Sequence, residues 1–232
     1  MTTLLPKWIS RAGSTAAAGL LALSLTSCSA AGGLFGSSPM DASQVVATQA
    51  PTTTAAPLQY NSVFTDMGSI HPTTMIGTQL ELELDMWTEQ KTHEWYPDNE
   101  KLFSFVVNVY DQSVPAEAPF ASKRLVYMSN LTVTATTTTT SGNVETPLVL
   151  NVDPVAVTLD PEALRSDYGL LITSPKGGFQ LESNSIGVVA DDTEGLSLDF
   201  AMTISSETTP GSGVYVTQPV HQLVPVAIFQ RS

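Results

Sequence analysis

A strict alternation of apolar and polar residues in the segment TQLELELDMW, residues 78–87, constrains this chain more than any other feature. Every second residue from Leu80 to Met86 is apolar, and every second residue from Gln79 to Asp85 is polar or charged. A period of two is that of a β-strand with one buried face, because successive side chains of a strand point to opposite sides. The same period occurs in LFSFVVNVY (102–110) and LSLDFAMTI (196–204), so we predict three half-buried strands.

Weaker patterns extend this prediction over the rest of residues 60–232. We expect further strands at 124–135, 146–152, 155–159, 169–173, 178–183, 214–217 and 223–229, separated by turn-forming segments such as SPKGG and ETTPGSG. The threonine run 136–140 is predicted to be a hairpin end or an edge strand. Many short strands with one apolar face are typical of an antiparallel two-sheet β-sandwich, here of immunoglobulin-like architecture, and we predict a single all-β domain.

One short connecting helix is expected within this β background. In the segment LDPEALRSDYG, Asp160 can cap a helix, Pro161 fits its first position, and Gly169 fits a left-handed exit. We predict that this helix forms a turn between the two sheets.

The chain has one cysteine, Cys28, which cannot form an intramolecular disulfide. Before it lie two basic residues, Lys7 and Arg11, and then an apolar stretch at residues 16–25. This is the pattern of a secretory signal, and the stretch is too short to span a hydrocarbon core that needs roughly 20 residues. We therefore expect residues 1–27 to be an export signal.

Residues Leu25, Thr26, Ser27 and Cys28 resemble the lipobox of bacterial lipoprotein precursors. The resemblance implies that signal peptidase recognises Leu25, Thr26 and Ser27, cuts before Cys28, and leaves a cysteine that carries lipid through its sulfur. Two or more acyl chains anchor a protein stably, whereas one does so only marginally. The alternative is an ordinary signal peptide that is cut nearby and leaves an unpaired cysteine.

The segment after the cysteine is rich in Ala, Ser, Thr and Pro and has no apolar face that could pack, so residues 28–59 are predicted to be a lipidated flexible tether. The leader carries two of the nine basic residues and none of the 22 acidic ones, so its removal lowers the formal charge from −13 to −15. Such a surface disfavours nucleic acid and anionic lipid headgroups as partners, although the charge can also serve solubility alone.

The sequence contains no nucleophile elbow, Walker A loop, dinucleotide fingerprint or HExxH motif. The three histidines, His71, His93 and His221, could meet only through the fold, as a zinc site or a Ser-His-Asp triad. Two acidic loops, 98–100 and 191–194, could offer oxygen ligands to calcium, but neither matches an EF-hand. We predict no catalytic residue, no metal and no cofactor.

Recognition is predicted in the segment THEWYPDNEK, residues 92–101, which joins the predicted strands at 78–87 and 102–110. A large aromatic in a loop is unfavourably hydrated unless it packs or binds something. The candidate binding residues are His93, Glu94, Trp95, Tyr96 and Asp98. The alternative is that Trp95 folds back over one open end of the sandwich.

These features together predict a non-catalytic lipoprotein at the cell membrane, anchored through Cys28 and facing the extracytoplasmic side. Its acidic sandwich would bind or block a protein or glycan of the envelope or the extracellular space. Three alternatives remain: an accessory protein that transfers a ligand and needs an apolar cavity between the sheets, a prophage-encoded superinfection-exclusion lipoprotein, and a secreted hydrolase with a dispersed site.

Overall fold

Two antiparallel sheets form the fold in the computed structural model, which describes residues 69–90 and 94–231. These residues lie in one of the two units into which the chain divides, and the other unit, residues 1–53, is outside the described residues. The lipobox and the predicted tether therefore also lie outside them.

The first sheet has five strands, and its main path runs β1–β3–β4–β9, with β2 also paired to β3. The bounds of these strands are β1 Ser69–Ile70, β2 Thr73–Met75, β3 Leu80–Trp87, β4 Lys101–Asp111 and β9 Phe179–Ile186. The second sheet has six strands in the path β11–β10–β5–β8–β7, with β6 also paired to β5. Their bounds are β5 Val126–Thr139, β6 Leu148–Val152, β7 Arg165–Ser166, β8 Gly169–Leu171, β10 Thr193–Glu207 and β11 Tyr215–Ala227.

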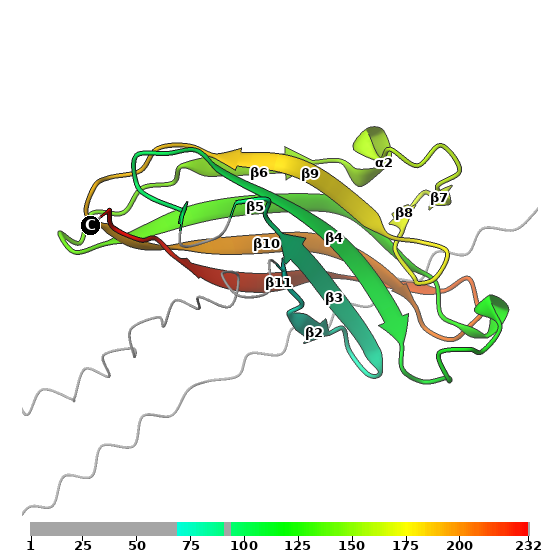
Figure 1. The fold of residues 1–232 in the computed structure, drawn as a ribbon. Coiled ribbons are helices and arrows are strands. Elements are labelled where there is room, and N and C mark those ends of the chain that lie inside the picture. Colours follow the sequence, from blue (N-terminus) through cyan, green and yellow to red (C-terminus); the bar gives the residue numbers. More distant parts are fainter. Residues whose placement is uncertain (1–68, 91–93, 232) are drawn as a thin grey trace, which may run out of the picture. The chain divides into compact units, whose positions relative to one another are not determined.

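Figure 1 shows β3, β4 and β9 of the five-stranded sheet lying over β5, β10 and β11 of the six-stranded sheet. The core lies between these layers, and the inward positions are those that the alternation predicted. Phe200 packs edge-on against Phe105, with ring centroids 5.2 Å apart, and so joins the two sheets. Full burial of each such side chain stabilises the fold by about 1.5–3 kcal/mol. The all-β sandwich prediction is confirmed.

The last strand, β11, is longer than the sequence indicated. The pattern predicted two short strands separated at residues 218–222, but β11 pairs with β10 without interruption over thirteen residues. Pro219 lies in this gap and Pro225 in the second predicted strand, and neither proline has an N–H to donate. The two prolines are an even number of residues apart, so their nitrogens point to the same side of β11. Because β11 is the edge of its sheet and its pairing with β10 is uninterrupted, that side is the unpaired one. The prolines also hinder the addition of a further strand there.

The position of the predicted helix was wrong. The helix α2 is Pro154–Val157, which overlaps the segment 155–159 that was predicted to be a strand, and it lies in a connection between strands of one sheet. Asp153 caps it by accepting a hydrogen bond from Val155 N at 3.0 Å. Asp160 instead accepts from Glu162 N at 2.8 Å in a local turn that leads to β7. Both sites begin with Asp-Pro, so packing decides between them: Pro154 is buried and Pro161 is exposed.

Asp111 and Arg124 form a polar clamp between the sheets. Asp111 ends β4, and Arg124 precedes β5 in the other sheet. The Arg124 guanidinium donates to the Asp111 carboxylate from Nε at 3.0 Å and from Nη2 at 2.6 Å. It also donates to the carbonyls of Thr78 and Gln79 in the turn before β3, each at 3.1 Å. One guanidinium therefore holds a turn of the five-stranded sheet to the first residues of β5.

The threonine run extends β5 to Thr139, after which the chain turns toward β6, as expected of a hairpin end. β5 pairs with β10 on one side and with β6 and β8 on the other, but the pairing with β6 ends at Ala135, so Thr136–Thr139 have a strand partner only in β10. The run therefore ends a hairpin and, over these residues, also has the one-sided pairing of an edge strand. Among the described residues, no helix is long and apolar enough to cross a membrane.

Candidate functional site

The predicted binding loop between β3 and β4 is held mainly by its own polar groups. Asn99 accepts from Tyr96 N at 3.1 Å and donates to the carbonyl of Glu94 at 2.7 Å, which closes a tight turn. Trp95 is fully buried in the core, as the alternative for this residue predicted. Glu94 and Asp98 are exposed, Tyr96 is half-buried, and His93 lies outside the described residues. The loop therefore presents carboxylates to solvent, while its tryptophan contributes to stability.

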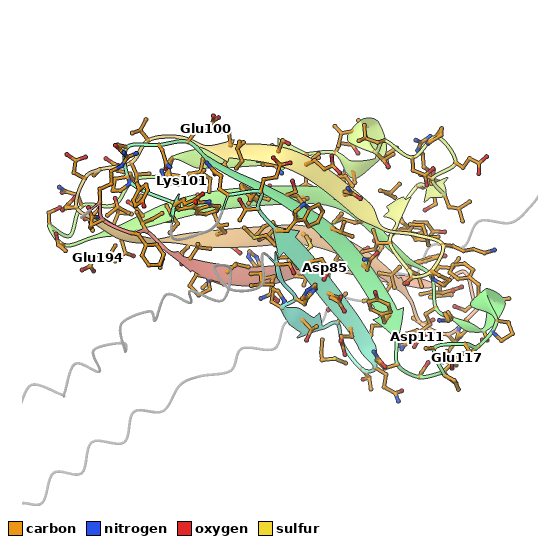
Figure 2. The ribbon with its side chains drawn as sticks, viewed as in Figure 1. Asp85, Glu100, Lys101, Asp111, Glu117 and Glu194 are labelled. Carbon is orange, nitrogen blue, oxygen red and sulfur yellow. The ribbon has the colours of Figure 1, made fainter. Side chains whose placement is uncertain are left out.

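Lys101 anchors this loop from the inside. It begins β4, its side chain is completely buried, and its ammonium donates to the carbonyls of Asn99 at 2.7 Å and Gly187 at 3.1 Å. Burial lowers the pKa of Lys101 to about 8, while the nearby Asp98 carboxylate acts in the opposite direction. Figure 2 shows Lys101 and Asp111 at opposite ends of β4, so a buried charge lies at each end of this strand.

The two acidic loops considered for calcium meet at one end of the sandwich. Asp98 and Asp191 line a cavity of about 180 Å³ together with Arg231. Arg231 pairs with Asp98 at 3.2 Å, and its guanidinium lies 4.8 Å from the centre of the Tyr96 ring. Asp192 accepts from Ser141 N at 2.9 Å, and hydrogen bonds from Ser141 lower the pKa of Asp192. Asp98 thus already has a cationic partner, and Asp192 has an N–H partner.

A different group of side chains converges on the outer face of the five-stranded sheet. His71 lies between β1 and β2, which both pair with β3, and continuing their register places it opposite Asp85. Pro72 separates the two short strands because it lacks an N–H, yet its carbonyl still accepts from Leu84 N at 3.0 Å. Glu83 is two residues from Asp85 along β3 and therefore shares its outward face. Figure 2 labels Asp85 on this strand.

Nitrogen and carboxylate oxygens are close together in this cluster. His71 Nδ1 contacts Asp85 Oδ1, and one ligand atom from each of His71, Glu83 and Asp85 lies within 4.8 Å of the other two. Burial raises the pKa of Glu83, and its interaction with the neighbouring Asp85 carboxylate raises the pKa further. Burial also raises the pKa of Tyr110, and the negative charge of Glu83 raises it further. The carboxylates are therefore crowded, and the nearby basic group is an imidazole.

Ser69 Oγ lies 3.2 Å from His71 Nε2, which gives the order of contacts found in a Ser-His-Asp triad. Such a triad acts through donors that stabilise an oxyanion where water is excluded. Here the His71 side chain is 56% exposed on the face of a sheet, so water reaches the imidazole freely. The arrangement is better suited to binding a cation than to acyl transfer.

A second pair of the same type lies on the outer face of the six-stranded sheet. His221 Nδ1 is 3.1 Å from Asp199 Oδ2, across the β10–β11 pair. Among residues 69–90 and 94–231, the group around His71 is the one in which a third carboxylate or imidazole joins such a pair. The sequence named both histidines, but it did not indicate which carboxylate each would meet.

Comparison with protein-family models, with curated proteins and with solved structures found no match for this chain.

Proposed function

We propose that this protein is a non-catalytic lipoprotein of the cell envelope, held on the extracytoplasmic side of the membrane by lipid on Cys28. Its acidic β-sandwich binds a protein or glycan of the envelope or the extracellular space. The observation that carries the proposal is the order of Leu25, Thr26, Ser27 and Cys28 directly after a basic and apolar leader. The tether of residues 28–59 would hold the sandwich away from the lipid surface.

The packing of the sandwich supports recognition by its outer surface. Phe103 and Phe105 from one sheet and Phe200 from the other fill the space between the sheets, and ring centroids lie 5.2–6.5 Å apart. A protein that carries an apolar ligand between its sheets would need that space. The outward side of β3 instead carries Glu81, Glu83 and Asp85, which favours a basic or metal-bearing partner.

Cys28→Ser tests the anchor. We expect the variant to lose incorporation of radiolabelled palmitate and to leave the membrane fraction, because a hydroxyl cannot accept the thioether-linked lipid. Ser29→Ala is the matched control, since it changes the neighbouring residue and keeps the lipobox. If Cys28→Ser sediments with membranes and incorporates label as the wild type does, the proposed anchor is wrong.

Crosslinking in intact cells tests the binding role. The anchored wild type should capture a defined envelope component, and the released Cys28→Ser variant should capture less of it because it is no longer concentrated at the membrane. Turnover of a substrate by the purified protein, without any captured partner, would contradict a non-catalytic role.

A further inference from the structure

We propose that His71, Glu83 and Asp85 form a binding site for a divalent transition-metal ion, with Zn²⁺ as the best match. The site lies on the outer face of the five-stranded sheet and joins β3 to the segment between β1 and β2. It goes beyond the proposed lipoprotein function and does not depend on the anchor.

The donor atoms have suitable chemistry and spacing. Zn²⁺ is bound by imidazole nitrogen and carboxylate oxygen at about 2.0–2.2 Å, so two ligand atoms of a tetrahedral ion are about 3.4 Å apart. The three candidate ligand atoms lie within 4.8 Å of one another, and small side-chain rotations would bring them to the spacing that Zn²⁺ requires. Such rotations leave the core unchanged, because all three side chains lie on the solvent side of the sheet. One imidazole among the ligands favours Zn²⁺ over Mg²⁺ or Ca²⁺, which prefer oxygen donors alone.

A second observation, independent of the carboxylates, concerns the orientation of the imidazole. A histidine that binds metal donates its other ring N–H to a neighbouring acceptor, which fixes the tautomer and the ring orientation. Ser69 Oγ lies 3.2 Å from His71 Nε2 and can accept that proton, while Nδ1 faces Asp85. Ser69 and His71 share a face of the strand because they are two residues apart. The positioning group for a metal-bound His71 is therefore already present.

The local charge also favours a cation. Glu81, Glu83 and Asp85 occupy three successive outward positions on β3. Within the described residues, neither Glu83 nor Asp85 forms an ion pair with lysine or arginine, and His71 is the basic partner of Asp85. A divalent ion would neutralise the mutual repulsion of these carboxylates, which a single imidazole can do only when it is protonated.

The chain contains its own control for this site. His221 and Asp199 form an exposed cross-strand pair like that of His71 and Asp85, but without a third ligand. A surface that binds metal weakly through any His-Asp pair would use both pairs. A specific site with three ligands would bind metal at the His71 pair and not at the His221 pair.

Calorimetric titration of the purified full chain with Zn²⁺ alone tests the proposal, and visible absorption of bound Co²⁺ reports whether nitrogen is a ligand. We expect one site per chain whose affinity falls more than about tenfold in His71→Gln and in Glu83→Gln, and stays unchanged in His221→Gln. Ser69→Ala should weaken binding by about tenfold, as loss of a positioning group does. Circular dichroism should confirm that each exposed variant remains folded.

Three results would overturn the proposal. One is the absence of Zn²⁺ binding at millimolar concentration, and another is equal weakening by His221→Gln and His71→Gln. The third is Ca²⁺ binding as tight as Zn²⁺ binding and insensitive to His71→Gln, which would indicate unspecific attraction to the acidic face. None of these results bears on the lipid at Cys28, so failure of this site and failure of the proposed anchor are distinguishable.

Discussion

Replacement of Asp111 by asparagine should strongly destabilise the sandwich. The Asp111 side chain is fully buried, and both of its carboxylate oxygens accept hydrogen bonds. Its Oδ1 accepts from Ser113 N at 3.0 Å, Ser113 Oγ at 2.6 Å and Arg124 Nη2 at 2.6 Å. Its Oδ2 accepts from Arg124 N at 2.8 Å and Arg124 Nε at 3.0 Å. An asparagine NH₂ group in either position therefore faces at least two N–H donors.

The expected magnitude follows from these contacts. A hydrogen bond to a charged group contributes about 1.5–3 kcal/mol, and a buried ion pair that loses one partner costs about 3–5 kcal/mol. The Arg124 side chain is only 14% exposed and would keep its charge without the carboxylate. We expect Asp111→Asn to lower the free energy of unfolding by about 3–5 kcal/mol.

Urea unfolding followed by tryptophan fluorescence measures this change, with the buried Trp95 as a reporter. Asp98→Asn is the matched control, because it makes the same chemical change in an exposed pair with Arg231 and should cost at most about 1 kcal/mol. A loss below about 1 kcal/mol for Asp111→Asn, or a loss equal to that of the control, would refute the reasoning.

Acid should reduce the difference between Asp111→Asn and the wild type. Burial alone would raise the pKa of Asp111, but the hydrogen bonds from Arg124 and Ser113 outweigh it and hold the pKa well below its usual range. A depressed pKa in the folded state contributes stability that is complete above the unfolded value, near 4, and is lost as the pH falls below it. The two proteins should therefore begin to converge in stability as the pH falls below about 4, and the difference should shrink further as the pH approaches the folded-state pKa.

Two further predictions concern Lys101 and Gly169. The pKa of Lys101 is lowered to about 8, against about 10.4 in an unfolded chain, so the unfolded state binds more protons between these values and stability should rise with pH there by about 1–3 kcal/mol. Denaturant titrations at pH 8 and pH 10 should detect the rise in the wild type and not in Lys101→Met. Gly169 has a φ of +114°, and a Cβ there would lie 2.2 Å from the Met128 carbonyl oxygen. Gly169→Ala should lower the thermal midpoint more than Gly142→Ala, whose added Cβ meets nothing within 4 Å; equal losses would contradict this steric explanation.

The sequence alone determined the three most regular strands and their inward faces. In β3, β4 and β10 the alternation is a local property, since each residue's side of the strand follows from its position in the chain. The turns that separate the strands are also a local property, because they follow from turn-forming residues next to one another in the chain. It failed at Asp153 and Asp160, where two Asp-Pro pairs offer equivalent helix caps and the burial of Pro154 decides between them.

Only the tertiary structure decided which polar side chains meet. Asp85 and His71 are fourteen residues apart, and Asp111 and Arg124 are thirteen apart, so no local spacing rule indicates either pair. The sequence predicted no metal site because His71 and the Glu83–Asp85 face lie in different segments of the chain. Their contact depends on the register of the β1–β3 and β2–β3 pairs. Which residues are buried follows from the alternation within one strand, whereas a binding site depends on how neighbouring strands align.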